Sequence, residues 1–295
     1  MNETVTQPVW ETTLPGTIDA LIHRSVGEVE PEGLRQLLER AVSGGKRMRP
    51  LLTALACEAA GGNEQDTIVA GAALELLHSS SLVHDDIMDK AELRRGMPTI
   101  VHGEGVSVAV LAGDALLAIA FRLINSINTP RRQQIQDVFT SAFLHLCEGQ
   151  YADVRPSGVA AGTAAAHAWM VERKTARLVE ACATIGGLLA TAHPVSVQAL
   201  ATYGRSLGLA YQATDDLLDA LGTHEETGKT VGLDSRNGRR TYLTIAYPEP
   251  DETEEIRKLV ADYIAAACKA LDALPPSSAR DRLVDLALNL IDRRS

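Results

Sequence analysis

Apolar residues recur at helical spacing through nearly the whole chain, and this pattern predicts a succession of helices. Two short amphipathic helices fall within residues 16–43, separated by Gly27 and Pro31, residue types that mark helix boundaries. Further helices are predicted over residues 50–60, 66–89, 106–127, 130–156, 163–192, 194–219, 254–271 and 279–291. No alternating apolar and polar run of convincing length predicts a strand. We therefore expect an all-α fold, a single-domain bundle of about ten or more helices over residues 1–295.

The predicted helix over residues 66–89 is apolar on nearly every side until it ends in three carboxylates, Asp85, Asp86 and Asp89. A helix that is apolar all round is buried, so its acidic end should face a central cleft, where polar groups need partners. Asp85 and Asp89 are one helical turn apart, and like charges at this spacing repel by roughly 0.2–0.5 kcal/mol. A cation that prefers oxygen ligands, such as Mg²⁺, would offset this repulsion.

The same acidic spacing recurs about 130 residues later. The predicted helix over residues 194–219 also ends in three carboxylates, Asp215, Asp216 and Asp219. One such motif is a weak signal, because an exposed acidic helix end is usually just solvated. If the two helices lie side by side with both acidic ends together, metal ions between them can hold a diphosphate.

Composition and charge narrow the class of ligand. Of the 295 residues, 45% are apolar and only 4% aromatic, and the formal net charge is −10. This charge argues against a general affinity for nucleic acid or anionic membranes. Twelve of the 28 Lys and Arg residues nevertheless gather in short clusters, as suits a small polyanion. They are Lys46, Arg47, Arg49, Arg94, Arg95, Arg173, Lys174, Arg177, Lys229, Arg236, Arg239 and Arg240.

Several features predict a cytoplasmic protein without stable membrane insertion. The first residues lack the basic and apolar regions of a signal peptide. The four cysteines show no CxxC spacing and lie in apolar contexts, which predicts buried reduced thiols. The longest apolar stretch, Val106–Ala120, is expected to be too short to span a bilayer and is interrupted by Asp114.

Six motifs together resemble those of the all-trans isoprenyl diphosphate synthases, the polyprenyl synthetase family. They occur in the family's order between residues 44 and about 243. The motifs are Gly44-Gly45-Lys46-Arg47-x-Arg49-Pro50, Asp85-Asp86-x-x-Asp89-x-x-x-x-Arg94-Arg95-Gly96, Gly113-Asp114-x-Leu116-Leu117, Lys174-Thr175, Gln212-x-x-Asp215-Asp216-x-x-Asp219 and Gly228-Lys229-x-x-Gly232-x-Asp234.

The resemblance implies a reaction and a set of site residues. Three Mg²⁺ ions held by Asp85, Asp89 and Asp215 would bind the diphosphate of an allylic substrate, and isopentenyl diphosphate would attack the allylic cation. The released pyrophosphate would remove the proton, so no dedicated protein base is required. Lys46, Arg49, His78 and Arg95 would hold isopentenyl diphosphate, and Arg94, Lys174, Thr175, Gln212 and Lys229 the allylic partner. The family also implies a homodimer.

Two positions depart from the family's usual pattern. Arg239 stands where the family usually has Lys, and Leu243 where it usually has Pro. Arginine keeps the positive charge but presents it as a planar fork, so we retain Arg239 as a diphosphate contact. Losing the proline should affect the turn and not the chemistry.

The resemblance also suggests a product length. In this family, bulky residues four and five positions before the first Asp keep products short, and here these positions are Ser81 and Ser80. We therefore expect a pocket with its floor deeper, at Leu77 or Phe121, and a C20 geranylgeranyl product. Longer or C15 products of the same family are the alternatives.

Three other functions fit parts of this sequence less well. A class I terpene cyclase shares the fold, but its second metal motif does not match the residues at Asp219 and Thr223. A di-iron bundle would use a motif like Glu75-x-x-His78, but it needs a second copy, and the sequence has none. A non-catalytic subunit would be expected to lose acidic motifs that are intact here. His102, Glu148 and Asp153 receive no role from the sequence.

Overall fold

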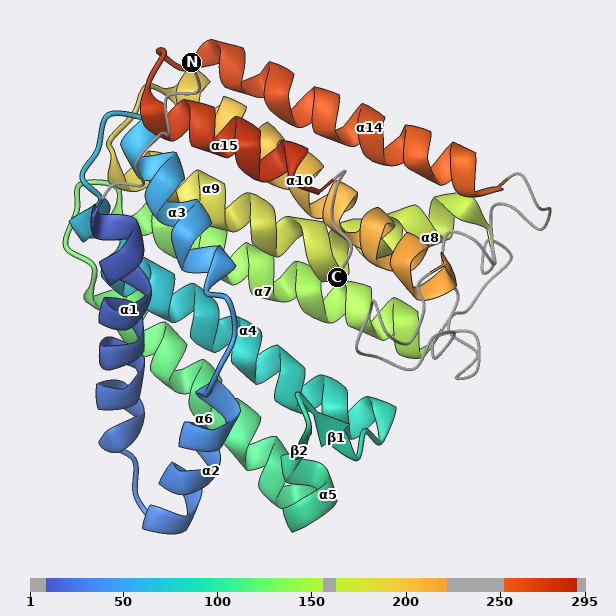
Figure 1. Cartoon of the computed structure of the whole chain (residues 1–295). Helices are drawn as coiled ribbons and strands as arrows, with labels where there is room; N and C mark the ends of the chain where they lie inside the picture. Colours follow the sequence, from blue (N-terminus) through green and yellow to red (C-terminus); the bar gives the residue numbers. More distant parts are fainter. Residues whose placement is uncertain (1–8, 156–162, 222–251, 291–295) are drawn as a thin grey trace.

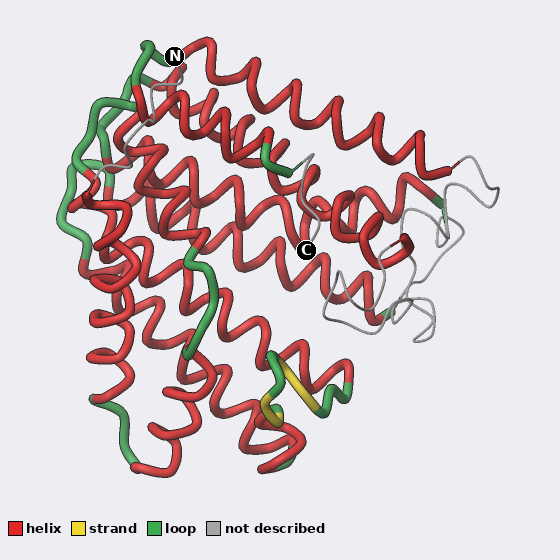
Figure 2. The backbone as a smooth tube through the Cα atoms, in the orientation of Figure 1, coloured by secondary structure: helices red, strands yellow, loops and turns green. Residues whose placement is uncertain are grey.

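The computed structural model describes residues 9–155, 163–221 and 252–290, and helices make up nearly all of this part of the chain (Figure 2). The prediction of an all-α fold is confirmed. Three long helices, α4 (Ile68–Asp89), α7 (Arg132–Val154) and α10 (Pro194–Leu221), run in the same direction, so that their C-terminal ends lie on one side of the molecule (Figure 1).

Shorter helices fill the spaces between and around these three. Helix α9 (Arg177–Leu189) contacts α3 (Met48–Ala59), α7 and α10, whereas α4 packs mainly on α6 (Val106–Ser126). The N-terminal pair is α1 (Val9–Gly27) and α2 (Glu32–Val42). The chain ends in α14 (Glu252–Ala270), the 3₁₀ turn η3 (Leu271–Ala273) and α15 (Ser278–Leu288).

Helix α4 lies at the centre of the core, as its all-round apolar pattern predicts. Leu74, Leu76 and Leu77 are completely buried. Small residues let its neighbours approach closely: at Gly113 of α6, a Cβ would collide with the imidazole of His84 on α4. The end of α4 is therefore fixed against α6, and this fixes the positions of the carboxylates that it carries.

The predicted helix over residues 163–192 is interrupted in the structure. It consists of α8 (Ala164–Val171), a π-helical turn η2 (Glu172–Ala176) and α9. The turn holds Lys174 and Thr175, and single π turns within α-helices are frequent at functional sites. Helical periodicity does not reveal it, because one extra residue barely disturbs an apolar pattern.

Three local predictions need correction. The loop after α4 contains a short hairpin, β1 (Leu93–Arg94) paired with β2 (Met97–Pro98), and the helix α5 (Ile100–Glu104); two-residue strands carry no readable alternation. A 3₁₀ turn, η1 (Glu64–Thr67), precedes α4. Helix α7 begins at Arg132 and not at Pro130, because the Thr129 carbonyl accepts the Arg132 amide in a preceding turn (3.1 Å).

The cysteines and the apolar helix α6 also differ from expectation. All four cysteines are free thiols, but Cys147 is exposed and Cys268 is only partly buried. Helix α6 has 21 residues with a mean hydropathy of 2.0 over its most apolar window, so in length and composition it could cross a membrane. The prediction that this stretch is too short is therefore wrong. Core helices of soluble proteins can have the same length and composition, and 44% of the most apolar window of α6 is buried in the bundle.

Candidate active site

The acidic residues predicted from the sequence lie, together with the unpredicted Asp153, where three parallel helices end. Asp85 and Asp89 lie in the last turns of α4, Asp153 in the last turn of α7, and Asp215 and Asp216 near the end of α10 (Figure 1). A helix C-terminus carries partial negative charge, which adds to that of the carboxylates. This end of the bundle therefore requires cations.

Asp85 shows the electrostatic consequence. Burial raises the pKa of its carboxyl from 3.8 to about 6. Lys174 and Arg94 act in the opposite direction and lower this pKa, whereas Asp89 and Asp153 raise it further. Four charged groups from four separate segments thus act on one carboxylate, which is the behaviour of a charge cluster at a functional site.

The π turn η2 connects the acidic ends of α7 and α10. The Lys174 ammonium donates to the Asp153 carboxylate (2.6 Å), and the Thr175 hydroxyl donates to the Gln212 side-chain oxygen (3.0 Å). Gln212 in turn donates to Asp216 (2.9 Å). The structure therefore brings Lys174, Thr175 and Gln212 together as the sequence predicted.

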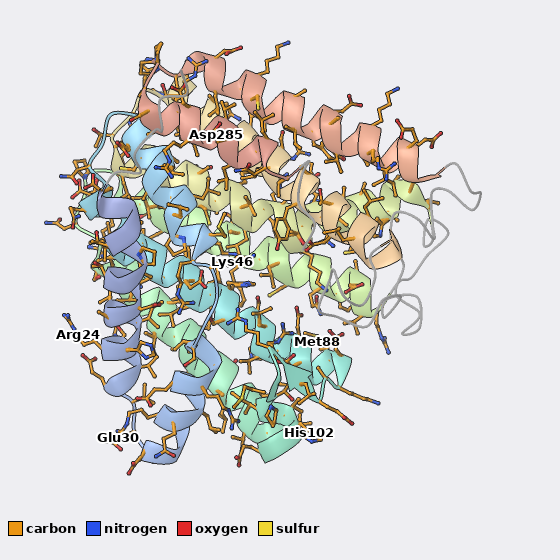
Figure 3. The ribbon with its side chains drawn as sticks, in the orientation of Figure 1. Arg24, Glu30, Lys46, Met88, His102 and Asp285 are labelled. Carbon is orange, nitrogen blue, oxygen red and sulfur yellow. The ribbon has the colours of Figure 1, made fainter. Side chains whose placement is uncertain are left out.

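A close helix contact explains how the π turn is held in place. Gly149 of α7 lies against Lys174, and a Cβ at this glycine would collide with the Lys174 backbone. Only a glycine lets the two backbones approach this closely. One residue further on, Gln150 donates a weak hydrogen bond to the Met88 sulfur of α4 (3.7 Å); Met88 lies at the end of α4 (Figure 3).

The middle aspartate of each motif is engaged within the protein. Asp86 is buried and accepts hydrogen bonds on both oxygens from the Arg94 Nε (2.9 and 3.0 Å), with Nη2 at 2.7 Å from one of them. Asp216 is also buried, hydrogen-bonded to Gln212 and 3.6 Å from the Nε2 of His167. These contacts fix the two motifs in place, and Arg94 anchors Asp86 in the structure.

Two of the residues predicted to bind isopentenyl diphosphate, Arg49 and Arg95, lie near His78. Burial lowers the pKa of His78 well below its usual value, and the positive charges of Arg49 and Arg95 lower it further. The imidazole is therefore neutral at pH 7. Lys46 is exposed on the loop before α3 (Figure 3), and the Arg95 Nη1 donates to the Ser43 carbonyl of that loop (2.9 Å).

The residues expected to set product length have different surroundings. Ser80 is only 1% exposed, and its hydroxyl donates to the Gly113 carbonyl of α6 (2.8 Å). Ser81 is partly buried and bonds within its own helix, to the His78 carbonyl (2.8 Å).

The two deeper candidates for the pocket floor, Leu77 and Phe121, also have different surroundings. Leu77 is completely buried, and Phe121 packs edge-on against two rings, Phe139 (5.4 Å) and Phe143 (6.3 Å). These are the chain's only three phenylalanines.

The donor set suits Mg²⁺ held jointly with a diphosphate. Among the described residues, no three His, Cys, Asp or Glu side chains are close enough to hold a metal by themselves. Mg²⁺ usually takes one or two carboxylates together with substrate phosphates, and Asp85, Asp89 and Asp215 can supply them. The Asp219 side chain, Lys229 and Arg239 lie outside the described residues.

Some functional contacts were missed by sequence reasoning. Asp153 and Gln150 belong to the site because α7 lies against η2 and α4, where they contact Lys174 and Met88. The one signal in the sequence was their position near the end of a predicted helix. Glu148 instead accepts hydrogen bonds from His145 (3.0 Å) and Arg173 (2.9 Å), which lower its pKa. His102 is exposed on α5 (Figure 3).

Comparisons with known proteins agree with this geometry. A sequence profile described as polyprenyl synthetase matches residues 31–273. The geranylgeranyl diphosphate synthase of Methanosarcina mazei is 38% identical over 231 residues, 77% of this chain and 71% of that enzyme. The geranylgeranyl pyrophosphate synthase of Geoglobus acetivorans is 33% identical over 306 aligned positions, covering 94% of this chain and 96% of that enzyme.

A solved structure gives the same result. The crystal structure of geranylgeranyl pyrophosphate synthetase from Pyrococcus horikoshii Ot3 superposes with a TM-score of 0.88 at 30% identity, covering 97% of this chain and 100% of that one. The chain therefore belongs to the polyprenyl synthetase family of all-trans isoprenyl diphosphate synthases, which confirms the resemblance inferred from its motifs.

Proposed function

We propose that this chain condenses isopentenyl diphosphate with an allylic diphosphate and releases a C20 geranylgeranyl diphosphate. The observation that carries the proposal is the joining of the acidic ends of α7 and α10 through Lys174 and Thr175 of one π turn, whose Lys174 charge also acts on Asp85 at the end of α4. The names of the similar enzymes support the product length. A class I terpene cyclase finds no comparable support.

The allylic diphosphate would bind between the ends of α4 and α10. Asp85, Asp89 and Asp215 would hold the metal ions, which supply positive charge to the departing diphosphate. Lys174 and Thr175 would contact the same diphosphate, with Lys174 exchanging its Asp153 partner for phosphate oxygens. The proposed allylic site also includes Arg94, Gln212, Lys229 and Arg239. The remaining carboxylates of the two motifs, Asp86, Asp216 and Asp219, complete it.

Isopentenyl diphosphate would bind beside His78. Lys46, Arg49 and Arg95 would supply positive charge, and the neutral imidazole would donate one hydrogen bond to a phosphate oxygen. In the reaction, the allylic carbon–oxygen bond breaks and the isopentenyl double bond attacks the resulting cation. The released pyrophosphate then removes a proton to restore a double bond.

We also propose that the enzyme is a homodimer joined through α6. Val106 and Leu111 of this helix are 57% and 61% exposed, and Val110 on the same helix is also exposed. An apolar helix face of this kind marks an interaction surface, and a second copy is the occupant that the family implies.

Incubation with isopentenyl diphosphate, Mg²⁺ and each allylic diphosphate in turn tests the proposed function. We expect chain elongation to a C20 diphosphate, detected by mass spectrometry, and none with EDTA present. The Asp85→Asn variant should lose at least about a hundredfold in kcat, since a lost charge-stabilising group typically costs that much. Absence of condensation with every allylic partner would refute the proposal.

A further inference from the structure

One of the three cations in the Gly44–Pro50 motif does not face the substrate region. Lys46 is exposed, but the Arg47 side chain is only 5% exposed. Arg47 has a left-handed backbone, with φ of 50° and ψ of 36°, directly before α3. Non-glycine residues rarely adopt this conformation unless surrounding contacts require it.

The buried guanidinium of Arg47 is held by three separate segments. Its Nε donates to Asp19 of α1 (2.6 Å), its Nη1 to Glu75 of α4 (2.9 Å), and its Nη2 to the carbonyl of Val42 at the end of α2 (2.8 Å). Glu75 is itself only 5% exposed. Each guanidinium nitrogen thus donates one hydrogen bond within the protein, and with the side chain only 5% exposed, Arg47 presents little surface to a diphosphate.

Glu75 connects this contact to the predicted isopentenyl site. It lies three residues before His78 on α4, so the two side chains share a helix face. The Arg47–Glu75 pair therefore ties the loop that carries Lys46 to the helix that carries His78. It also gives Glu75 of the Glu75-x-x-His78 pair a structural role, because its carboxylate binds an arginine.

The same loop is also contacted by Arg95. A Cβ at Gly45, whose φ is 104°, would lie 3.3 Å from Nη1 of Arg47 and 3.3 Å from Nη2 of Arg95. Two guanidinium groups, one buried and one exposed, thus lie on the same side of Gly45 and leave no room for a side chain there. Arg95 itself bonds the Ser43 carbonyl, so both arginines fix the position of the loop.

We propose that Arg47 is a positioning residue that fixes the loop against α4 through Glu75 and Asp19, setting Lys46 and Arg49 at the spacing from His78 that isopentenyl diphosphate requires. This inference rests on the proposed function. It predicts a selective effect: loss of the Arg47–Glu75 tether weakens binding of isopentenyl diphosphate, whereas the allylic site between α4 and α10 is unaffected.

Steady-state kinetics of the full-length enzyme test this inference. We expect Arg47→Met to raise the KM for isopentenyl diphosphate about tenfold or more, with the KM for the allylic diphosphate changed less than about twofold. Glu75→Met should give the same selective rise, although it leaves the Arg47 charge in place. The double variant should be no worse than either single variant, because both act through one contact.

Two further variants keep the test decisive. Asp19→Asn removes only the negative charge of the partly exposed partner, so it should fold even if the buried changes do not, and it should show the same selectivity at a few-fold amplitude. Arg122→Met is the matched control. It breaks an exposed ion pair between α6 and Glu28 (3.0 Å) and should leave both KM values unchanged.

The outcomes separate this inference from the proposed function. If the wild-type chain does not condense the two substrates, the proposed function fails. If it does, an equal change in both KM values in the Arg47 and Glu75 variants, or no change in either, overturns the positioning role. If Arg47 contacted the diphosphate directly, Arg47→Met would weaken isopentenyl binding while Glu75→Met would not.

Discussion

Asp85 illustrates, at the scale of one residue, how a functional group is held in an unfavourable state. Its raised pKa means that the folded protein binds a proton at this carboxyl more tightly than the unfolded chain does. The stability associated with the neutral form is therefore present below about pH 4 and is lost as the pH rises through about 6. A carboxylate kept ionised at a substrate site lowers stability in the absence of its cation.

Replacing Asp85 by Asn should therefore stabilise the metal-free protein. In EDTA at pH 7.5, we expect the free energy of unfolding to rise by about 1–3 kcal/mol, and the gain to disappear near pH 4. Urea denaturation at several pH values measures it. Asp285→Asn, at an exposed position of α15 (Figure 3), is the control and should change stability by less than about 0.5 kcal/mol. A loss of stability in the Asp85 variant at pH 7.5 would contradict this account.

Substitution by phenylalanine should have different effects at Ser80 and Ser81. Ser81→Phe enters a partly buried position and should shorten the main product from C20 to C15, as judged by chromatography of the hydrolysed products. Ser80→Phe would instead overpack the contact with Gly113 and cost roughly 1–3 kcal/mol in stability. Unchanged chain length in a folded Ser81 variant would remove this residue from the pocket.

At the scale of elements, the contact between α7 and the π turn determines where Lys174 and Thr175 lie. The periodicity of residues 163–192 predicted one helix, and nothing in the residues Glu172–Ala176 signals a wider turn. The position of the π turn depends on another element, α7. Residue 149 of α7 must be glycine, because any side chain there would collide with the Lys174 backbone. Such interruptions are decided by packing and are not readable from local sequence.

Gly149→Ala tests this contact. The added methyl group meets backbone and not a flexible side chain, so we expect a loss of about 1–3 kcal/mol in stability and a lower kcat. Gly33→Ala in α2 is the matched control. Its Cβ would meet nothing within 4 Å, so it should be neutral or stabilise by up to about 1 kcal/mol. Wild-type kcat and stability in the Gly149 variant would show that the close approach is dispensable.

At the scale of the whole molecule, the helical bundle and the two acidic motifs could be predicted from the sequence because both depend on helical periodicity. Asp85 and Asp89 share a face whatever surrounds them. Asp153 could not be predicted, since its role depends on Lys174 reaching it from another segment. Lys46 and Arg47 are neighbours in sequence, yet Lys46 is exposed and Arg47 is buried, with a left-handed backbone that the sequence does not reveal.

The exposed apolar side of α6 leads to a prediction about assembly. Leu111→Arg should convert the proposed dimer into a monomer, measured by analytical ultracentrifugation, because a buried unpaired charge is strongly unfavourable. Leu288→Arg on α15, a similarly exposed leucine, is the control and should leave the dimer intact. A wild-type protein that is monomeric at micromolar concentration, or that partitions into lipid vesicles, would contradict the dimer.

We expect the acidic ends of α4 and α10 to form one metal-dependent clamp for a diphosphate. Calorimetric titration of the protein with inorganic pyrophosphate tests it most directly. We predict binding with Mg²⁺ and little in EDTA, with Asp85→Asn and Asp215→Asn each weakening it about tenfold or more and the double variant losing less than the sum. Equal affinity without Mg²⁺, or an Asp215 variant that binds as tightly as wild type, would contradict the claim.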